Sequence, residues 1–124
     1  MGTRSFVGIK TESGIRAIYV HWDGYLDGVG KDLQAYTTVA EVEELISHGD
    51  RSSLDGGYYK DRGESGVEPT DYADFDEFFE ACVRSWGEFY YVFDRGIWYC
   101  GKTYESSPLY RKLVPYADAI KKVV

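Results

Sequence analysis

The sequence is poor in the residues that build metal and redox sites. Its 124 residues include two histidines, two cysteines and one methionine. Cys82 and Cys100 form no C-x-x-C pair and lie within apolar patterns, so we expect buried free thiols and not a disulfide or metal site. His48 stands at the end of a predicted helix, where the helix dipole accounts for it. The sequence therefore predicts neither a metal nor a cofactor.

Positive charge and long apolar runs are also scarce. The sequence has fourteen lysines and arginines and twenty-one acidic residues, which gives a net charge of −7. This charge argues against general nucleic-acid binding through phosphates and favours a basic partner surface. No apolar run approaches the roughly 20 residues that a membrane span needs. The polar start MGTRSFVGIK also lacks the apolar core of a signal peptide, so we expect no membrane association.

Aromatic residues are abundant, with twelve tyrosines and three tryptophans. This length and a hydrophobic content of 44% predict one domain, residues 1–124, with one packed core. Two interpretations of the aromatic residues stay open. They fill that core, or some of them lie at an interface, where a large ring with a polar atom is favoured.

The order of the predicted elements indicates the fold class. RSFVGIK and IRAIYVHW, separated by TESG, predict a hairpin with Gly14 in its turn, and EFYYVFDRGIWYCG predicts a second hairpin around DRG. Helices are expected between the hairpins and at the C-terminal end of the sequence. We therefore expect an α+β domain: an antiparallel sheet of about four strands, made of two hairpins, with two to three helices packed on one face.

Three helical regions are predicted from apolar spacing and caps. KDLQAYTTVAEVEELISHGD has a break near Thr37 and Thr38, and Thr38 with Glu41 forms a capping box. Its expected buried residues are Val39, Val42, Leu45 and Ile46, and its stop is Gly49. The helix over 74–85 has Asp74 as N-cap and Gly87 as stop. Its expected buried residues are Phe75, Phe78, Phe79, Cys82 and Val83.

The third helix begins with Ser107 as cap and Pro108 at the first helical position, and Pro115 breaks or kinks it. Residues 51–70 show little periodicity. They predict a long loop with a short strand at GYYKDR, and loops of this length are often functional or disordered.

Seven carboxylates and no basic residue lie between positions 64 and 80. They are Glu64, Glu68, Asp71, Asp74, Asp76, Glu77 and Glu80. One interpretation is a solvated helix face, with acids favoured near the helix N-terminus. The other is a partner-binding surface that joins Glu41, Glu43 and Glu44 of the earlier helix. Such a surface would present phosphate-like charge to a basic groove and compete there with nucleic acid.

The stretch AIYVHWDGYLDGVG, residues 17–30, suggests a second kind of site. It lacks the phosphate-loop ending and the G-x-G-x-x-G spacing. Arginine forks and aromatic rings nevertheless suit an anionic nucleotide. The alternative ligand pocket would consist of Arg4, His21, Trp22, Asp23, Tyr25, Lys60, Asp61 and Arg62. A third interpretation is an enzyme in which His21, Asp23 and these arginines act on a phosphoester. No spacing here is one that catalysis requires, so we predict no catalytic residue.

The segments MGTRS, HWDGYL, GDRSSL, KDRGE and FYYVFDRGIWY together resemble a group of short, uncharacterised bacteriophage and prophage proteins. They span most of the chain in order. The resemblance implies a context and no catalytic residue, since small non-structural phage proteins often inhibit a host enzyme or a host defence.

From the resemblance and the charge together, we expect a non-enzymatic phage accessory protein in the cytoplasm of the infected bacterium. It would bind and inhibit a host defence or nucleic-acid-processing complex, as an anti-CRISPR protein does. Its partner would be a host protein or ribonucleoprotein complex, and a homodimer is compatible with the sequence. The alternatives are a protein that sequesters an anionic nucleotide signal and a small phosphoester-acting enzyme.

Overall fold

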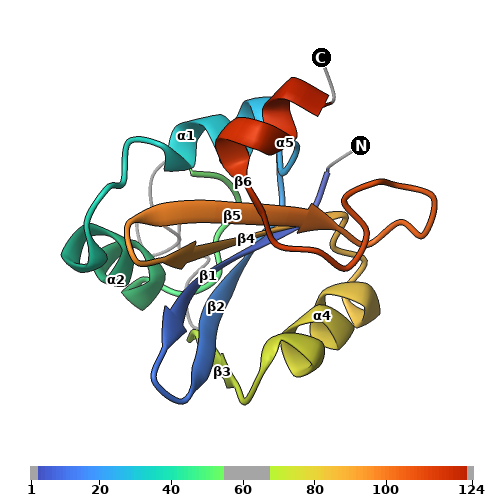
Figure 1. Cartoon of the computed structure of the whole chain (residues 1–124). Coiled ribbons are helices and arrows are strands. Elements are labelled where there is room, and N and C mark those ends of the chain that lie inside the picture. The colour runs from blue at the N-terminus through green and yellow to red at the C-terminus, as the bar shows by residue number, and fades with distance from the viewer. Residues whose placement is uncertain (1–2, 55–67, 123–124) are drawn as a thin grey trace.

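Figure 1 shows the computed structural model, which describes residues 3–54 and 68–122. Its strands are β1 (Ser5–Thr11), β2 (Gly14–Val20), β3 (Thr70–Tyr72), β4 (Phe89–Asp94), β5 (Ile97–Lys102) and β6 (Val114–Pro115). Its helices are the π-helix η1 (Leu26–Gly30), α1 (Lys31–Leu33), α2 (Val39–Ser47), α4 (Phe75–Arg84) and α5 (Tyr116–Lys122). The fold is α+β, as predicted.

The six strands form one mixed sheet in the order β3-β2-β1-β4-β5-β6. Both predicted hairpins are present, because β1 pairs with β2 and β4 pairs with β5 in antiparallel fashion. The hairpins meet through β1 and β4, which are parallel, with Ser5 opposite Phe89. The prediction of an entirely antiparallel sheet of about four strands is therefore wrong in detail. The edge strands β3 and β6 are too short to show a period-two pattern.

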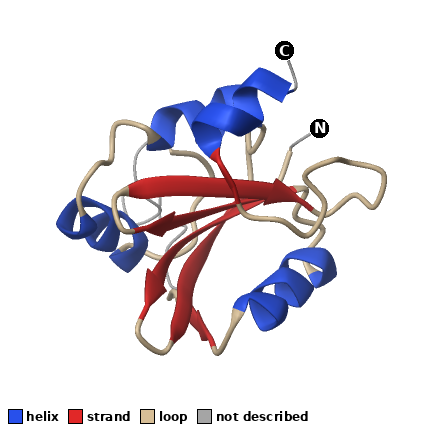
Figure 2. Ribbon diagram, in the orientation of Figure 1, coloured by secondary structure: helices blue, strands red, loops and turns tan. Residues whose placement is uncertain are grey.

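Helices lie on both faces of this sheet, which corrects the prediction of one covered face (Figure 2). Residues of η1, α1, α2 and α5 share one buried cluster with Ile18 and Val20, and α4 forms the other cluster with Ile15 and Ala17. β2 is therefore apolar on both faces because both are covered. An amphipathic alternation would have marked a strand with one face in water.

The break and the capping box predicted for the first helical region are confirmed. Thr38 Oγ1 accepts a hydrogen bond from Glu41 N at 3.2 Å, and Glu41 Oε1 accepts one from Thr38 N at 3.1 Å. Gly49 has φ +83°, as a glycine helix stop requires. Val39 is 50% exposed, so its predicted burial is wrong, since only Val42, Leu45 and Ile46 of α2 face the core.

The C-terminal end of α4 differs from the prediction at two residues. Val83 is 46% exposed because the buried face is centred on Phe78, Phe79 and Cys82. The left-handed residue after the helix is Trp86, with φ +62°, and not Gly87. Trp86 N donates to Val83 O, and Gly87 N donates to Cys82 O at 2.8 Å. These two bonds form a Schellman motif with a tryptophan in the position that favours glycine.

The helix predicted from Ser107 is absent. Ser107 Oγ accepts a hydrogen bond from Leu109 N within a turn, and α5 begins at Tyr116, directly after Pro115. Proline has no N–H to donate and disfavours helical backbone in the residue before it. A helix from residue 107 would therefore be interrupted at Pro115. A helix that begins directly after Pro115 loses no intrahelical hydrogen bond.

Both cysteines are buried and free, as predicted. Burial raises the pKa of the Cys82 thiol, and it raises the pKa of Cys100 to about 12. The thiolate is the reactive form, so neither cysteine is a nucleophile near neutral pH. The strand predicted at GYYKDR falls within residues 55–67, which lie outside the described residues.

Phe78 anchors α4 to the sheet through ring contacts with Phe6, Tyr72 and Tyr90. We expect Phe78→Ala to lower the free energy of unfolding by about 3–5 kcal/mol, because the cavity it leaves cannot collapse fully. Chemical denaturation measures this change. An unfolding midpoint close to that of the wild type would mean that α4 does not pack through this residue.

Trp86 is 77% exposed and holds a positive φ. We expect Trp86→Gly to raise the free energy of unfolding by about 1 kcal/mol, because glycine removes the left-handed strain. Trp86→Ala is the matched control, since it deletes the indole but keeps a Cβ at positive φ. Equal stability of the two variants would contradict the strain argument.

Candidate functional site

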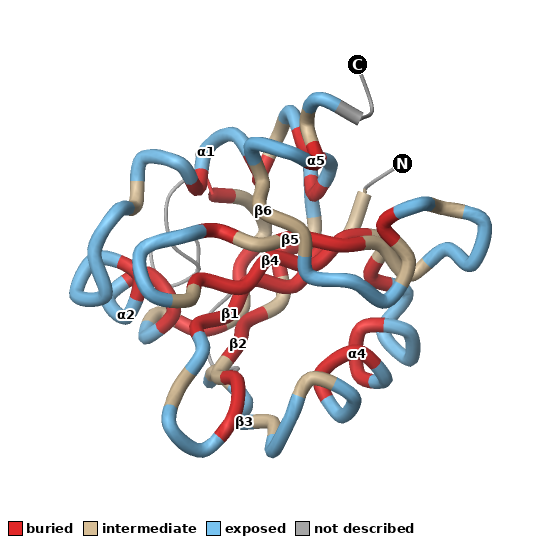
Figure 3. The backbone as a smooth tube through the Cα atoms, viewed as in Figure 1, coloured by how far each residue is buried: buried red, intermediate tan, exposed pale blue. Residues whose placement is uncertain are grey.

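The acidic surface consists of the carboxylates of the 64–80 run that the structure describes: Glu68, Asp71, Asp74, Asp76, Glu77 and Glu80. Every one of them is exposed, on β3, on α4 or on the short segments beside them (Figure 3). Glu64 lies outside the described residues. The structure therefore gathers the described part of the run along one edge of the sheet and the helix next to it.

Several of these acids have local structural roles. Asp74 Oδ1 accepts a hydrogen bond from Glu77 N at 2.8 Å and caps α4, as predicted. Asp71 forms an ion pair with Arg16 at 3.1 Å. Arg111 contacts Asp76 at 3.3 Å and Glu80 at 3.7 Å. Two arginines against six carboxylates leave the acidic surface negative, although part of the charge stabilises the fold.

The acids of α2 lie on a helix that packs on the other face of the sheet. α2 packs on the sheet face opposite α4, and its Glu41 side chain caps the helix at Thr38. Glu43 and Glu44 are exposed on that other layer. Glu43 also lines a cavity with Lys10, Glu12 and Ser13 at the tip of the β1–β2 hairpin, so the predicted combination of the two acidic helices stays a prediction.

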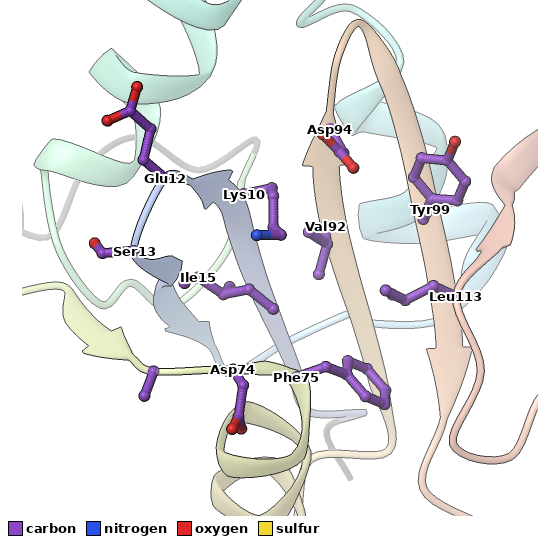
Figure 4. A pocket seen from close by; sticks show the side chains of 12 residues that line it. Lys10, Glu12, Ser13, Ile15, Asp74, Phe75, Val92, Asp94, Tyr99 and Leu113 are labelled. Carbon is purple, nitrogen blue, oxygen red and sulfur yellow. The ribbon is translucent and has the colours of Figure 1, made fainter.

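An open cavity of about 350 Å³ lies beside the acidic surface, between the β1–β2 hairpin and the N-terminus of α4 (Figure 4). Its lining residues are Lys10, Glu12, Ser13, Gly14, Ile15, Ala73, Asp74, Phe75, Val92, Asp94, Tyr99 and Leu113. Ile15, Val92 and Leu113 point into it and make an apolar floor. The ammonium group of Lys10 also points inward, and Glu12, Asp74 and Asp94 are among the lining residues, although the carboxylates of Glu12 and Asp74 point away from the cavity.

This combination suits an apolar anchor carried by a positively charged partner. An interface gains most of its free energy where a side chain enters a desolvated pocket, and charged groups around it set orientation and association rate. Asp74 both lines the cavity and belongs to the acidic surface. The cavity and the acidic surface therefore form one continuous candidate binding site.

The stretch 17–30 forms a turn that the backbone holds in place. Asp23 has φ +59°, Gly24 N donates to Thr3 O at 2.7 Å, and Tyr91 Oη donates to Gly24 O. A Cβ at Gly24 would come within 2.7 Å of Ser5, so only glycine fits there. Tyr25 Oη contacts Asp23 Oδ1 at 3.4 Å. These contacts account for the Asp-Gly pair as turn structure.

The alternative ligand pocket is assembled only in part. Tyr19 Oη and His21 Nδ1 are 2.8 Å apart, and the rings of His21 and Trp22 contact each other at 4.5 Å. Burial raises the pKa of Tyr19, and the positive charge of Arg4 partly opposes this rise. Lys60, Asp61 and Arg62 lie outside the described residues.

Two features of the structure have no counterpart among the predicted site residues. The first is the exposed Trp86, which lines a cavity of about 560 Å³ with Arg4 and Tyr104. The second is Asp50, which lines a smaller cavity with Tyr19 and Tyr72. A left-handed backbone conformation at a tryptophan cannot be predicted from a sequence pattern, and Asp50 and Tyr72 are far apart in the chain. Only the sheet brings these side chains together.

Within residues 3–54 and 68–122, no group of three or more His, Cys, Asp or Glu side chains is arranged to hold a metal ion. No helix in the same ranges has the length and apolar character of a membrane span.

The chain was compared with protein families, curated proteins and solved structures. No family model, no curated protein and no solved structure matches the chain. The resemblance of its segments to phage proteins stays a prediction.

Proposed function

We propose that this chain is a non-enzymatic phage accessory protein that binds and inhibits a host defence or nucleic-acid-processing complex. The single observation that supports this is the acidic surface of six exposed carboxylates, one of which, Asp74, also lines an open cavity with an apolar floor. A groove that normally holds nucleic acid is basic, so it is complementary to this surface. Occupation of such a groove would exclude the nucleic acid.

The charge and the cavity have different roles in this proposal. Exposed carboxylates accelerate encounter with a basic target and suppress docking on acidic proteins. The cavity takes an apolar side chain of the target and limits dissociation, because buried anchors mainly affect the off-rate. Neither role needs a reacting group.

A second candidate, sequestration of an anionic nucleotide, is favoured by one observation. Arg4 lines the cavity of about 560 Å³ together with Trp86 and Tyr104, and its charge opposes the rise in the pKa of Tyr19, which contacts His21. A guanidinium group beside aromatic rings suits a phosphate and a base. Glu88 also lines this cavity and disfavours an anion, so this candidate ranks second.

The test replaces three of the six carboxylates of the acidic surface by neutral amides of the same size, which removes their charge and their ion pairs. In the variant Asp71→Asn, Asp76→Asn, Glu80→Gln, each side chain keeps its size next to Arg16 or Arg111. The complex captured by tagged protein from infected bacteria is identified, and its affinity for the purified protein is measured against salt concentration. We expect the variant to bind at least about tenfold more weakly with a shallower salt dependence, because fewer charges attract the groove.

The matched control changes the net charge equally on the opposite layer: Asp27→Asn, Glu44→Gln and Asp118→Asn. We expect this control to bind and inhibit like the wild type. The proposal fails if both triple variants lose affinity equally, or if the captured complex binds this protein and nucleic acid simultaneously. Loss of inhibition with Arg4→Ala alone would favour nucleotide sequestration instead.

A further inference from the structure

Asp50 is a half-buried carboxylate that the proposed binding site does not use. It follows the Gly49 stop of α2 and reaches the edge of the sheet, where its Oδ1 accepts a hydrogen bond from Tyr19 N at 2.9 Å. It lines a cavity of about 330 Å³. The other lining residues are Phe6, Ala17, Tyr19, Thr70, Tyr72 and Ser85. This cavity is separate from the one in Figure 4, with which it shares no lining residue.

Aromatic rings fixed by packing form much of this cavity wall. The ring of Tyr19 meets that of Phe6 edge to face at 5.6 Å, and the ring of Tyr72 meets that of Phe78 at 5.6 Å. The faces of such rings attract cations. The volume is near the lower end of the roughly 300–1,000 Å³ typical of ligand pockets, so it suits one long side chain better than a nucleotide.

The electrostatics of the cavity favour a positive occupant. Burial raises the pKa of Asp50, although the Tyr19 N–H bond partly opposes the rise. Within the described part of the chain, no lysine or arginine forms an ion pair with Asp50. Arg4 and Arg84 act only as weaker influences on the pKa of Tyr19 and Tyr72, respectively. A carboxylate partly removed from water without a counterion gains most from a cationic ligand.

We propose that this cavity receives a cationic side chain, lysine or arginine, of the basic partner that the acidic surface binds. The inference rests on the proposed function for the source of that side chain. Glu68 and Asp71 lie on either side of Thr70 and are both exposed, so a basic segment crossing β3 meets carboxylates there, of which Asp71 is paired with Arg16. Asp50 then forms a charge-assisted hydrogen bond, and the Tyr19 and Tyr72 rings add cation–π attraction.

The experiment titrates the intact protein with N-acetyl-arginine amide, N-acetyl-lysine amide and the neutral isostere N-acetyl-citrulline amide. NMR follows the ring signals of Tyr19 and Tyr72, assigned with Tyr19→Phe and Tyr72→Phe. We expect saturable shifts with a cationic probe and none with the citrulline probe. Asp50→Asn should weaken binding at least about tenfold, because it keeps an acceptor for Tyr19 N but removes the charge.

The same variant separates a binding role from a structural one. We expect Asp50→Asn to unfold at a temperature equal to or above that of the wild type at pH 7, because a partly desolvated charge is removed. A second variant, Tyr72→Leu, keeps an apolar wall but removes the ring face, and it should also weaken binding of the cationic probe. Together the two variants keep the test decisive if one of them folds poorly.

Four outcomes would overturn the inference. The first is that neither cationic probe binds, and the second is that the citrulline probe binds as tightly as the cationic ones. The third is that Asp50→Asn binds the cationic probe with wild-type affinity. The fourth is that the cationic probe binds only to the double variant Lys60→Ala, Arg62→Ala. The last would show that the chain fills the cavity itself. Asp71, Asp76 and Glu80 do not line the cavity, so their neutralisation should leave probe binding unchanged. If the Asp71→Asn, Asp76→Asn, Glu80→Gln variant still binds its target as tightly as the wild type, the proposed function is refuted. If the same variant also binds the cationic probe, the inference about the Asp50 cavity is not refuted with it.

Discussion

The parallel pairing of β1 with β4 is the interaction on which the rest of the structure depends. It joins two hairpins that are separate in the sequence and makes β1 and β4 the central strands of the sheet. These central strands are apolar on both faces, so both faces must be covered. One face carries Val7, Ile9, Tyr91 and Phe93, and the other carries Phe6, Tyr90 and Val92. This requirement places α4 and α2 on opposite faces of the sheet.

The unequal cover on the two faces creates the candidate sites. η1, α1, α2 and α5 share one face, whereas α4, with ten residues, is the helix in the other described cluster. A helix of that length spans about 15 Å and leaves part of a sheet face open. Asp74 and Phe75 at its start line the cavity of Figure 4, and Ser85 just after its end lines the Asp50 cavity. The two cavities therefore lie at the two ends of one short helix.

Features with local causes could be predicted from the sequence. The two hairpins, the Thr38 capping box, the Asp74 cap and the buried thiols each depend on residues a few positions apart or on a single apolar pattern. The exposure of the described acids also follows from local chemistry, since a run of carboxylates without counterions stays in water. Val39 and Val83 were predicted incorrectly because a spacing rule identifies a face approximately, while packing decides its edges.

By itself, the sequence determined the α+β class, the hairpin pairings, most helix caps and the acidic character of the 64–80 run, because these depend on short-range backbone preferences and on charge. Only the tertiary structure decided the parallel β1–β4 register, the cover on both faces and the meeting of Asp50 with Tyr72 beside Tyr19. Contacts between residues so far apart leave no periodic trace in one chain. They form because the assembled sheet buries the most apolar surface when its two hairpins join.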